Sequence, residues 1–305
     1  MSKGKRMSNI ELLRIFSMFL IVLGHTVWET NWQFSNMSPL KATSIQMFWI
    51  GGKYGVNIFF LITGYFISTR KEFKIKPLIT LWIDVLAISW LIGIFSLLFK
   101  VPGQNIKTLL ATFFPISMNC YWFITVYFFL YLLSPFLNVL IRNINKINYF
   151  YLLSGGFLYL FVFATIFSNA TAGSGNTLIT GIYLYLLGAA IRKYHLQDYV
   201  RDKKRTLLIG IVVLLLIMIL SIYFMDLFQF NGVLSYSRLR FGKFIDGDSP
   251  FQLIFSCFIF LLFLNLKIES NKYINKLAST TLFIYMIHTN YLLKDFIFDH
   301  IFRLQ

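Results

Sequence analysis

The chain has 305 residues, of which 57% are hydrophobic, 19% aromatic and only 13% charged. Because an ordinary soluble domain carries about 25% charged residues, this composition excludes a water-soluble fold and predicts one all-α membrane domain over residues 1–305. The net charge of +16 does not indicate nucleic-acid binding, because the basic residues fall in short clusters between apolar runs instead of on one folded face.

Nine apolar runs follow one another along the chain, each long enough to cross a hydrocarbon core about 30 Å thick. The stretch 106–118 is also apolar, but it is short and contains Pro115, so it is typical of an interfacial or re-entrant segment or of a tenth crossing. The sequence therefore predicts a polytopic bundle of about 9–10 transmembrane helices. The nine runs are 8–29, 45–68, 77–99, 121–141, 147–168, 176–192, 205–224, 250–267 and 277–298.

Lysine and arginine counts predict the orientation of this bundle. With a cytoplasmic N-terminus, the cytoplasmic connections hold 18 of these residues and the outer connections hold 8, while Arg14 and Lys53 lie within spans. Positive residues favour the cytoplasmic side. We therefore expect a multi-pass protein of the cell membrane with its N-terminus in the cytoplasm and, with nine spans, its C-terminus outside.

The first apolar run contains four ionisable residues, Glu11, Arg14, His25 and Glu29. Charges inside a membrane are costly and usually serve a function. Arg14 and His25 are 11 residues apart, which is almost three helical turns, so they share one face and are separated by about 16 Å along the axis. Glu11 is three residues before Arg14, and Glu29 is four after His25, so each acid can pair with its neighbour and hold its rotamer or protonation state. We therefore expect both acids to belong to the catalytic site as orienting residues.

This face combines two kinds of chemistry. The guanidinium of Arg14 suits a phosphate group, and the imidazole of His25 can take a proton from a hydroxyl. An anionic donor on the cytoplasmic side and a hydroxyl acceptor farther out would fit the pair. The alternative is that Arg14 extends to the inner interface and His25 caps the outer one, both merely ending the span.

Several ordered segments resemble those of the acyltransferase-3 family of integral membrane acyltransferases. LLRIFSMFLIVLGH, residues 12–25, is similar to the family's Arg-x10-His signature. The likeness continues over most of the chain, with Thr63 in place of the common serine before Gly64 as a departure. It is carried by GGKYGVNIFFLITGYFIS (51–68), YWFITVYFFLYLLSPFLN (121–138), YLYLLGAAIRKY (183–194) and LASTTLFIYMIHTN (277–290).

The resemblance implies transfer of an acyl group, usually acetyl from acetyl-CoA, to a hydroxyl of a cell-surface carbohydrate. Arg14 and His25 match the family's essential pair, and His288 matches a histidine often seen in its last span. His25 would act as a general base or would itself accept the acyl group. His288 would assist it, or would only hydrogen-bond a neighbouring helix.

Two further sets of residues are candidates for the same reaction. Donors to a developing oxyanion are expected among Asn57, Tyr65, Tyr121 and Trp122. The phosphates of CoA are expected at Arg14 and at a cytoplasmic cluster, although topology signalling also accounts for that cluster. The cluster consists of Arg70, Lys71, Lys74 and Lys76.

The sequence thus predicts an O-acyltransferase, in the first place an O-acetyltransferase, that uses acyl-CoA as donor and an exported polysaccharide or lipid-linked sugar as acceptor. Its surroundings are the lipid bilayer, and its oligomeric state is undefined. A metal is not expected, because Cys120 and Cys257 lie at or inside apolar runs without a CxxC or histidine pattern. The alternative function is a polysaccharide or small-anion transporter or flippase that uses the same charges as a binding relay.

Overall fold

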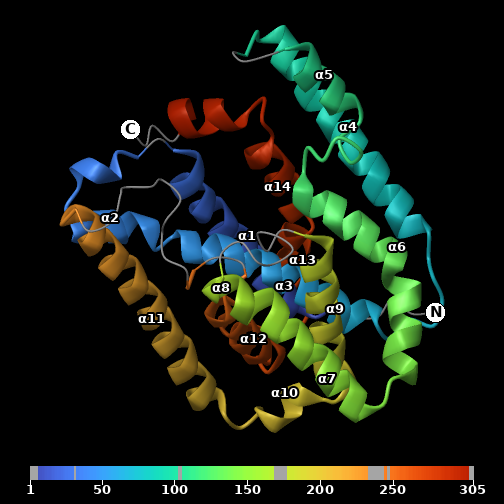
Figure 1. Cartoon of the computed structure of the whole chain (residues 1–305). Helices are drawn as coiled ribbons and strands as arrows, with labels where there is room; N and C mark the ends of the chain where they lie inside the picture. Colours follow the sequence, from blue (N-terminus) through green and yellow to red (C-terminus); the bar gives the residue numbers. More distant parts are fainter. Residues whose placement is uncertain are drawn as a thin grey trace.

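The computed structural model describes residues 6–30, 32–101, 105–167, 177–232, 244–245 and 248–301. Within these ranges the chain is helical and contains no strand (Figure 1), so the all-α polytopic bundle is confirmed. The principal helices are α1 (Ser8–Glu29), α2 (Pro39–Gln46), α3 (Trp49–Ile67), α4 (Lys76–Leu98), α5 (Ile106–Phe113), α6 (Trp122–Asn143), α7 (Lys146–Phe157), α8 (Ala164–Ile166), α9 (Leu178–Lys193), α10 (Leu196–Tyr199), α11 (Lys204–Phe230), α12 (Pro250–Leu264), α13 (Lys272–Ala278) and α14 (Thr281–Thr289).

Every predicted apolar run contains helix. Six helical stretches in the described residues are long and apolar enough to cross a membrane: α1, α2 with α3, α4, α6, α7 to α8, and α11. A π-helical segment, η2 (Leu158–Phe163), joins α7 to α8. Of the other predicted spans, α9 has 16 residues and α12 has 15. The short apolar stretch before α6 forms α5, which has only 8 residues.

The last predicted span is divided into three pieces. Its polar residues Ser279 and Thr280 separate α13 from α14, and Asn290 ends α14. The side chain of Asn290 accepts from the backbone N–H of Leu292 at 2.9 Å, so it competes with helix continuation, as Asn does at helix ends. The chain then turns into the π-helical segment η3 (Phe296–Ile301).

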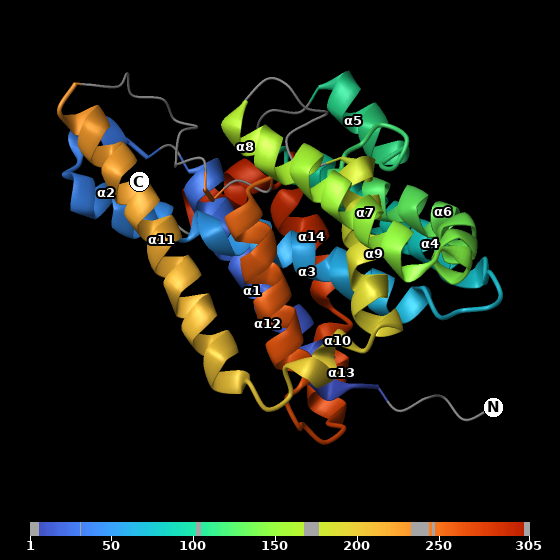
Figure 2. The same ribbon diagram turned by 60° about the horizontal axis from the view of Figure 1, so that its bottom comes forward.

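Helix α3 lies at the centre of the bundle, with α1, α9 and α12 around it (Figure 2). Its candidate span is 78% buried, whereas that of α11 is 17% buried. Small residues permit the close packing of α3. A Cβ added to Gly24 of α1 would lie 2.8 Å from the Cα of Gly52, and one added to Gly64 would collide with the backbone carbonyl of Tyr185 on α9. Close backbone approach at glycine is a common basis of helix association in membranes.

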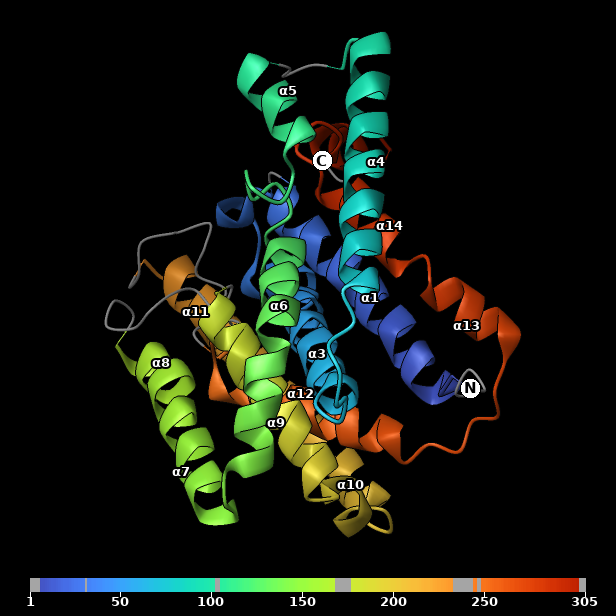
Figure 3. The ribbon, with the colours of Figure 1, turned by 90° about the vertical axis from the view of Figure 1, so that its right-hand side faces the viewer.

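The outermost helices expose apolar side chains. Helix α4 packs mainly against α5 and α14 and extends beyond the rest of the bundle together with α5 (Figure 3). Its Leu91 and Leu98 are 65% and 74% exposed, which is the pattern of a helix surrounded by lipid.

The ends of the helices fall on two sides of the molecule. In Figure 3 the start of α1 and the α3–α4, α6–α7, α9–α11 and α12–α13 connections lie toward the lower end, and the end of α4 and the start of α5 lie toward the upper end. The connections at the lower end are those that carry the larger share of Lys and Arg. The site residues of α1 therefore extend from the basic end of the bundle, at Arg14, toward the opposite end, at His25.

Candidate active site

Two histidines from the first and last helices contact each other. His25 Nδ1 of α1 lies 2.9 Å from His288 Nε2 of α14, and His288 Nδ1 lies 2.6 Å from the backbone oxygen of Ile284. A carbonyl oxygen only accepts hydrogen bonds, so His288 Nδ1 carries a proton. With both rings neutral, His288 Nε2 must accept from His25 Nδ1–H. This leaves His25 Nε2 unprotonated and able to accept a proton.

The surroundings of His288 hold its ring in place. His288 is 5% exposed, and the ring of Tyr285 meets it edge-on at a centroid distance of 5.9 Å. Two residues beyond His288, Asn290 Nδ2 donates to the hydroxyl of Tyr121 at 2.6 Å. Tyr121 is thus the one oxyanion candidate whose hydroxyl contacts the α14 segment that carries His288.

Glu29 does not pair with His25, contrary to the local pairing that its spacing allows. Its carboxylate lies 2.6 Å from Lys294 Nζ, in the turn after α14. The ring nitrogen of His25 is already engaged by His288, and Lys294 offers Glu29 a full positive charge. Lys53 of α3 also lies close enough to interact electrostatically with His25.

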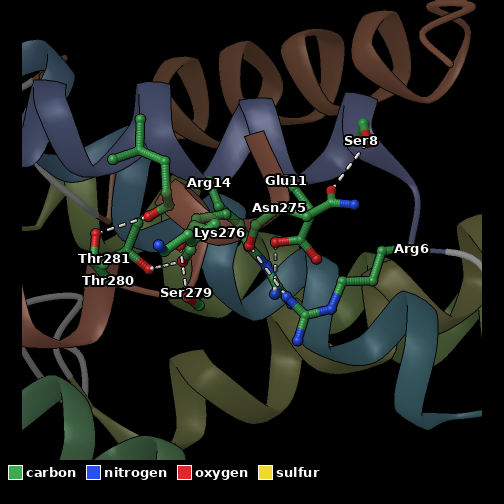
Figure 4. A network of polar contacts seen from close by, with 11 residues as sticks. Arg6, Ser8, Glu11, Arg14, Asn275, Lys276, Ser279, Thr280 and Thr281 are labelled. Atoms are coloured by element: carbon green, nitrogen blue, oxygen red, sulfur yellow. Dashed lines mark hydrogen bonds and ion pairs between the residues drawn. The ribbon is translucent and has the colours of Figure 1, made fainter. Parts of the chain in front are cut away.

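The inner part of the α1 face contains Arg14 and Glu11. Arg14 donates to Glu11 Oε2 at 3.4 Å, as their spacing predicts, while its buried Nε has no hydrogen-bond partner among the described residues. Figure 4 shows the start of α14 at Thr281 beside this pair. The neighbouring α13 is held to the start of α1 because Ser8 Oγ donates to Asn275 Oδ1 at 3.0 Å.

A cavity of about 200 Å³ extends from Arg14 to Tyr285. Four helices line it: α1 supplies Arg14, α3 supplies Thr63, α6 supplies Tyr127, and α14 supplies Tyr285. Tyr285 is the residue that contacts the ring of His288. The cavity therefore extends between the guanidinium of Arg14 and the aromatic wall behind the histidine pair.

A second cavity, of about 150 Å³, lies at the basic end of the bundle. It is bounded by the connection between α3 and α4 and by the second half of α6. Three residues of the predicted basic cluster line it, Arg70, Lys71 and Lys74, whereas Lys76 does not, because it begins α4. Arg142 of α6 joins them. We call this cavity the basic pocket.

The other oxyanion candidates make their polar contacts elsewhere. Asn57 Nδ2 donates to Ser256 Oγ of α12 at 3.3 Å. The hydroxyl of Tyr65 accepts from Arg192 of α9 at 2.9 Å. Trp122 packs against the main hydrophobic core and meets the ring of Phe123. Among the described residues, no hydrogen bond or ring contact joins these three side chains to the histidine pair.

Sequence reasoning missed a polar stripe on α6 that connects the two cavities. Tyr127 lines the cavity beside Arg14, and Tyr131, Ser134, Asn138 and Arg142 line the basic pocket. Their separations of three or four residues place them on one helix face. The spacing of these polar residues, in the apolar run 121–141 and at Arg142 directly after it, was a detectable sign of a polar helix face.

Comparison with known proteins gives one finding and two absences. No curated protein and no solved structure matches the chain. Among the described residues, no group of three or more His, Cys, Asp or Glu could hold a metal ion. A family model described as an acyltransferase domain matches residues 7–304, nearly the whole chain. This match and the apolar helices show that the chain is a membrane acyltransferase that belongs to the acyltransferase-3 family.

Proposed function

We propose that this membrane acyltransferase moves an acyl group, in the first place acetyl, from acyl-CoA to a hydroxyl of an exported or cell-surface polysaccharide or its lipid-linked precursor. The observation that supports this most directly is the histidine pair. His288, fixed by the carbonyl of Ile284, accepts from His25 Nδ1 at 2.9 Å. His25 Nε2 is then unprotonated and available to accept a proton from the acceptor hydroxyl.

In the proposed reaction His25 takes one proton from the acceptor and later gives it to the leaving group. The acceptor hydroxyl gives its proton to His25 Nε2 as its oxygen attacks the thioester carbonyl carbon. The tetrahedral intermediate collapses, the carbon–sulfur bond breaks, and the leaving sulfur takes the proton back from His25. During this cycle His288 accepts from His25 Nδ1–H, so it orients the imidazole and stabilises its charged form.

The donor enters from the basic end of the bundle. Arg14, with an unpartnered Nε in the cavity wall, binds an anionic part of the donor. The cavity toward Tyr285 receives the acyl-carrying arm. In this orientation the N-terminus is cytoplasmic, the acceptor approaches from the outer side, and residues 1–305 act as one domain of the cell membrane.

The function is tested by measuring ester groups on surface glycan in cells that carry single variants. His25→Ala is expected to abolish the ester and Arg14→Ala to lower it strongly, while both leave the amount of protein in the membrane unchanged. His195→Ala and Arg201→Ala are matched controls, because both residues are exposed outside the candidate site, near Asp198. Normal ester content in both site variants would contradict the proposal.

A second measurement separates acyl transfer from transport. Purified protein incubated with acetyl-CoA and glycan should release CoA thiol in a manner that requires His25. A transporter that only moves glycan leaves the thioester intact, so the absence of thiol release with any glycan tested argues against the proposed function.

A further inference from the structure

The basic pocket holds positive charge that the protein does not neutralise. Arg70, Lys71, Lys74 and Arg142 line it and are exposed, and none of them forms an ion pair with a residue that the structure describes. Glu72 is the one acidic residue in the lining. The four cations outnumber the one acid, so the lining of the pocket is positively charged and suits a polyvalent anion.

A helix-capping role does not explain Arg142. Basic residues often occur in the last turn of a helix, where they satisfy free carbonyls and interact with the helix dipole. In α6 this role belongs to Lys193 of α9, whose Nζ donates to the backbone oxygens of Ile141 at 2.5 Å and Ile144 at 3.0 Å. Arg142 is left facing the pocket.

The basic pocket and the Arg14 cavity lie along the same two helices. On α3, Ile67 lines the basic pocket and Thr63 lines the Arg14 cavity. On α6 the corresponding residues are Tyr131 and Tyr127, one turn apart. The hydroxyl of Tyr127 interacts electrostatically with both Arg14 and Arg70. A long ligand can therefore place one end at Arg142 and extend its other end toward the histidines.

The side chains that line the basic pocket indicate which end of such a ligand it binds. Arginine binds phosphate through paired, charge-assisted hydrogen bonds, and the ring of Phe73, 43% exposed, also lines the pocket. In acyl-CoA the group farthest from the thioester is the nucleotide, which carries a phosphomonoester on its ribose. The position and charge of the basic pocket both match that group.

We propose that the basic pocket binds the ribose 3′-phosphate of acyl-CoA and that Arg142 is a specificity-determining residue for it, together with Arg70, Lys71 and Lys74. The inference rests on the proposed donor. It differs from the sequence-based prediction in two residues, because it adds Arg142 and removes Lys76. The diphosphate and the pantetheine arm then lie toward Tyr131, Tyr127 and Arg14.

The test compares binding of CoA and of 3′-dephospho-CoA to the purified full-length protein by isothermal titration calorimetry. Because one charge-assisted contact with phosphate contributes a factor of about 10–100 in affinity, the unmodified protein should bind CoA more tightly than dephospho-CoA by that factor. Arg142→Gln should bring the two affinities to within about threefold. Lys76→Gln, which removes a neighbouring cation outside the pocket, should leave the ratio unchanged.

A variant with the opposite effect guards against misfolding as an explanation. Glu72→Gln removes the one acid in the pocket lining, so it should increase the preference for CoA. A damaged protein would lose affinity for both ligands instead. Equal binding of CoA and dephospho-CoA to the unmodified protein, or a preference for CoA that survives Arg142→Gln, overturns this inference and leaves the proposed function standing. Failure to bind either ligand contradicts the proposed donor as well.

Discussion

The outer and inner halves of the site are built in different ways. At the outer half, His25 and His288 meet through one hydrogen bond of 2.9 Å, and the ring of His288 is 5% exposed and fixed by Ile284. At the inner half, Arg14 lies in the wall of an open cavity with a longer contact of 3.4 Å to Glu11. The first half has one donor–acceptor arrangement of two rings, whereas the second lines an open cavity and is held by charge.

This difference separates two tasks that an acyltransferase must perform. Proton transfer requires the correct tautomer and orientation, so a single displaced atom is costly. Binding an anion requires several cations near one another, and each contributes a share that salt can screen. Variants in the outer half should therefore change kcat, and variants in the inner half should change the KM for the donor.

The largest effect is expected at His25. Loss of a positioned general base typically lowers the rate by about 10²–10⁴-fold, so His25→Gln should lower kcat by that factor and leave the KM for acyl-CoA within a few-fold. Steady-state thiol release gives both constants. A variant that retains kcat and raises KM would reverse the assignment of the two halves.

The next effect concerns His288, which sets the tautomer of His25. In His288→Ala the acceptor for His25 Nδ1–H is missing, and we expect kcat to fall by about 10–100-fold, part of the contribution of the base. His288→Gln supplies an amide oxygen in place of Nε2 and should recover part of the loss. If the alanine and glutamine variants are equally impaired, His288 does not act by accepting this hydrogen bond.

Arg14 should show the opposite pattern of constants. Removal of one charge-assisted contact with a phosphate group corresponds to about 10–100-fold in affinity, so Arg14→Gln should raise the KM for acyl-CoA by that factor with a smaller change in kcat. Arg14→Lys should be intermediate, because it keeps the charge without the planar fork. An unchanged donor KM in Arg14→Gln would indicate that this arginine does not contact the donor.

The smallest effect is expected at the pair of Glu29 and Lys294. Their side chains are 21% and 31% exposed, and partly exposed ion pairs contribute about 0–1 kcal/mol. Glu29→Gln should therefore lower the free energy of unfolding by less than about 1 kcal/mol and leave kcat nearly unchanged. The unfolding temperature of the purified protein measures the first effect. A loss of kcat comparable to that of His288→Ala would place Glu29 in the catalytic machinery instead.

Local features were predictable from the sequence. The apolar runs identified the helices, and helical spacing placed Arg14 and Glu11 in contact. His288 was expected to be able to approach His25 because it lies in the outer half of the last span, but local spacing could not specify their hydrogen bond, because the two residues are 263 apart in the chain. The same applies to Glu29 and Lys294, which are 265 residues apart. These contacts depend on how α14 packs against α1, and one apolar run does not specify its neighbour.

The basic cluster shows a second feature that the sequence alone does not specify, namely which of its cations line one pocket. Arg70, Lys71, Lys74 and Lys76 are adjacent in sequence, and composition alone treats them as equivalent. The start of α4 at Lys76 divides them, since it directs this residue away from the pocket that the other three line. Arg142, at the end of α6, lines the pocket in place of Lys76. The exact end of one helix and the start of the next thus determine which cations gather in one place.

The contact between Gly24 and Gly52 also has a consequence for catalysis. Gly24 immediately precedes His25, and any side chain at this position would meet the α3 backbone at 2.8 Å. Enlarging Gly24 would push α1 away from α3 and shift the imidazole of His25 relative to His288, whereas a Cβ added to Gly52 would lie 3.4 Å from the Cα of Gly24, an ordinary contact. Gly24, a residue without a functional group, therefore constrains the geometry of proton transfer, and a larger side chain at position 24 should lower turnover before it prevents folding.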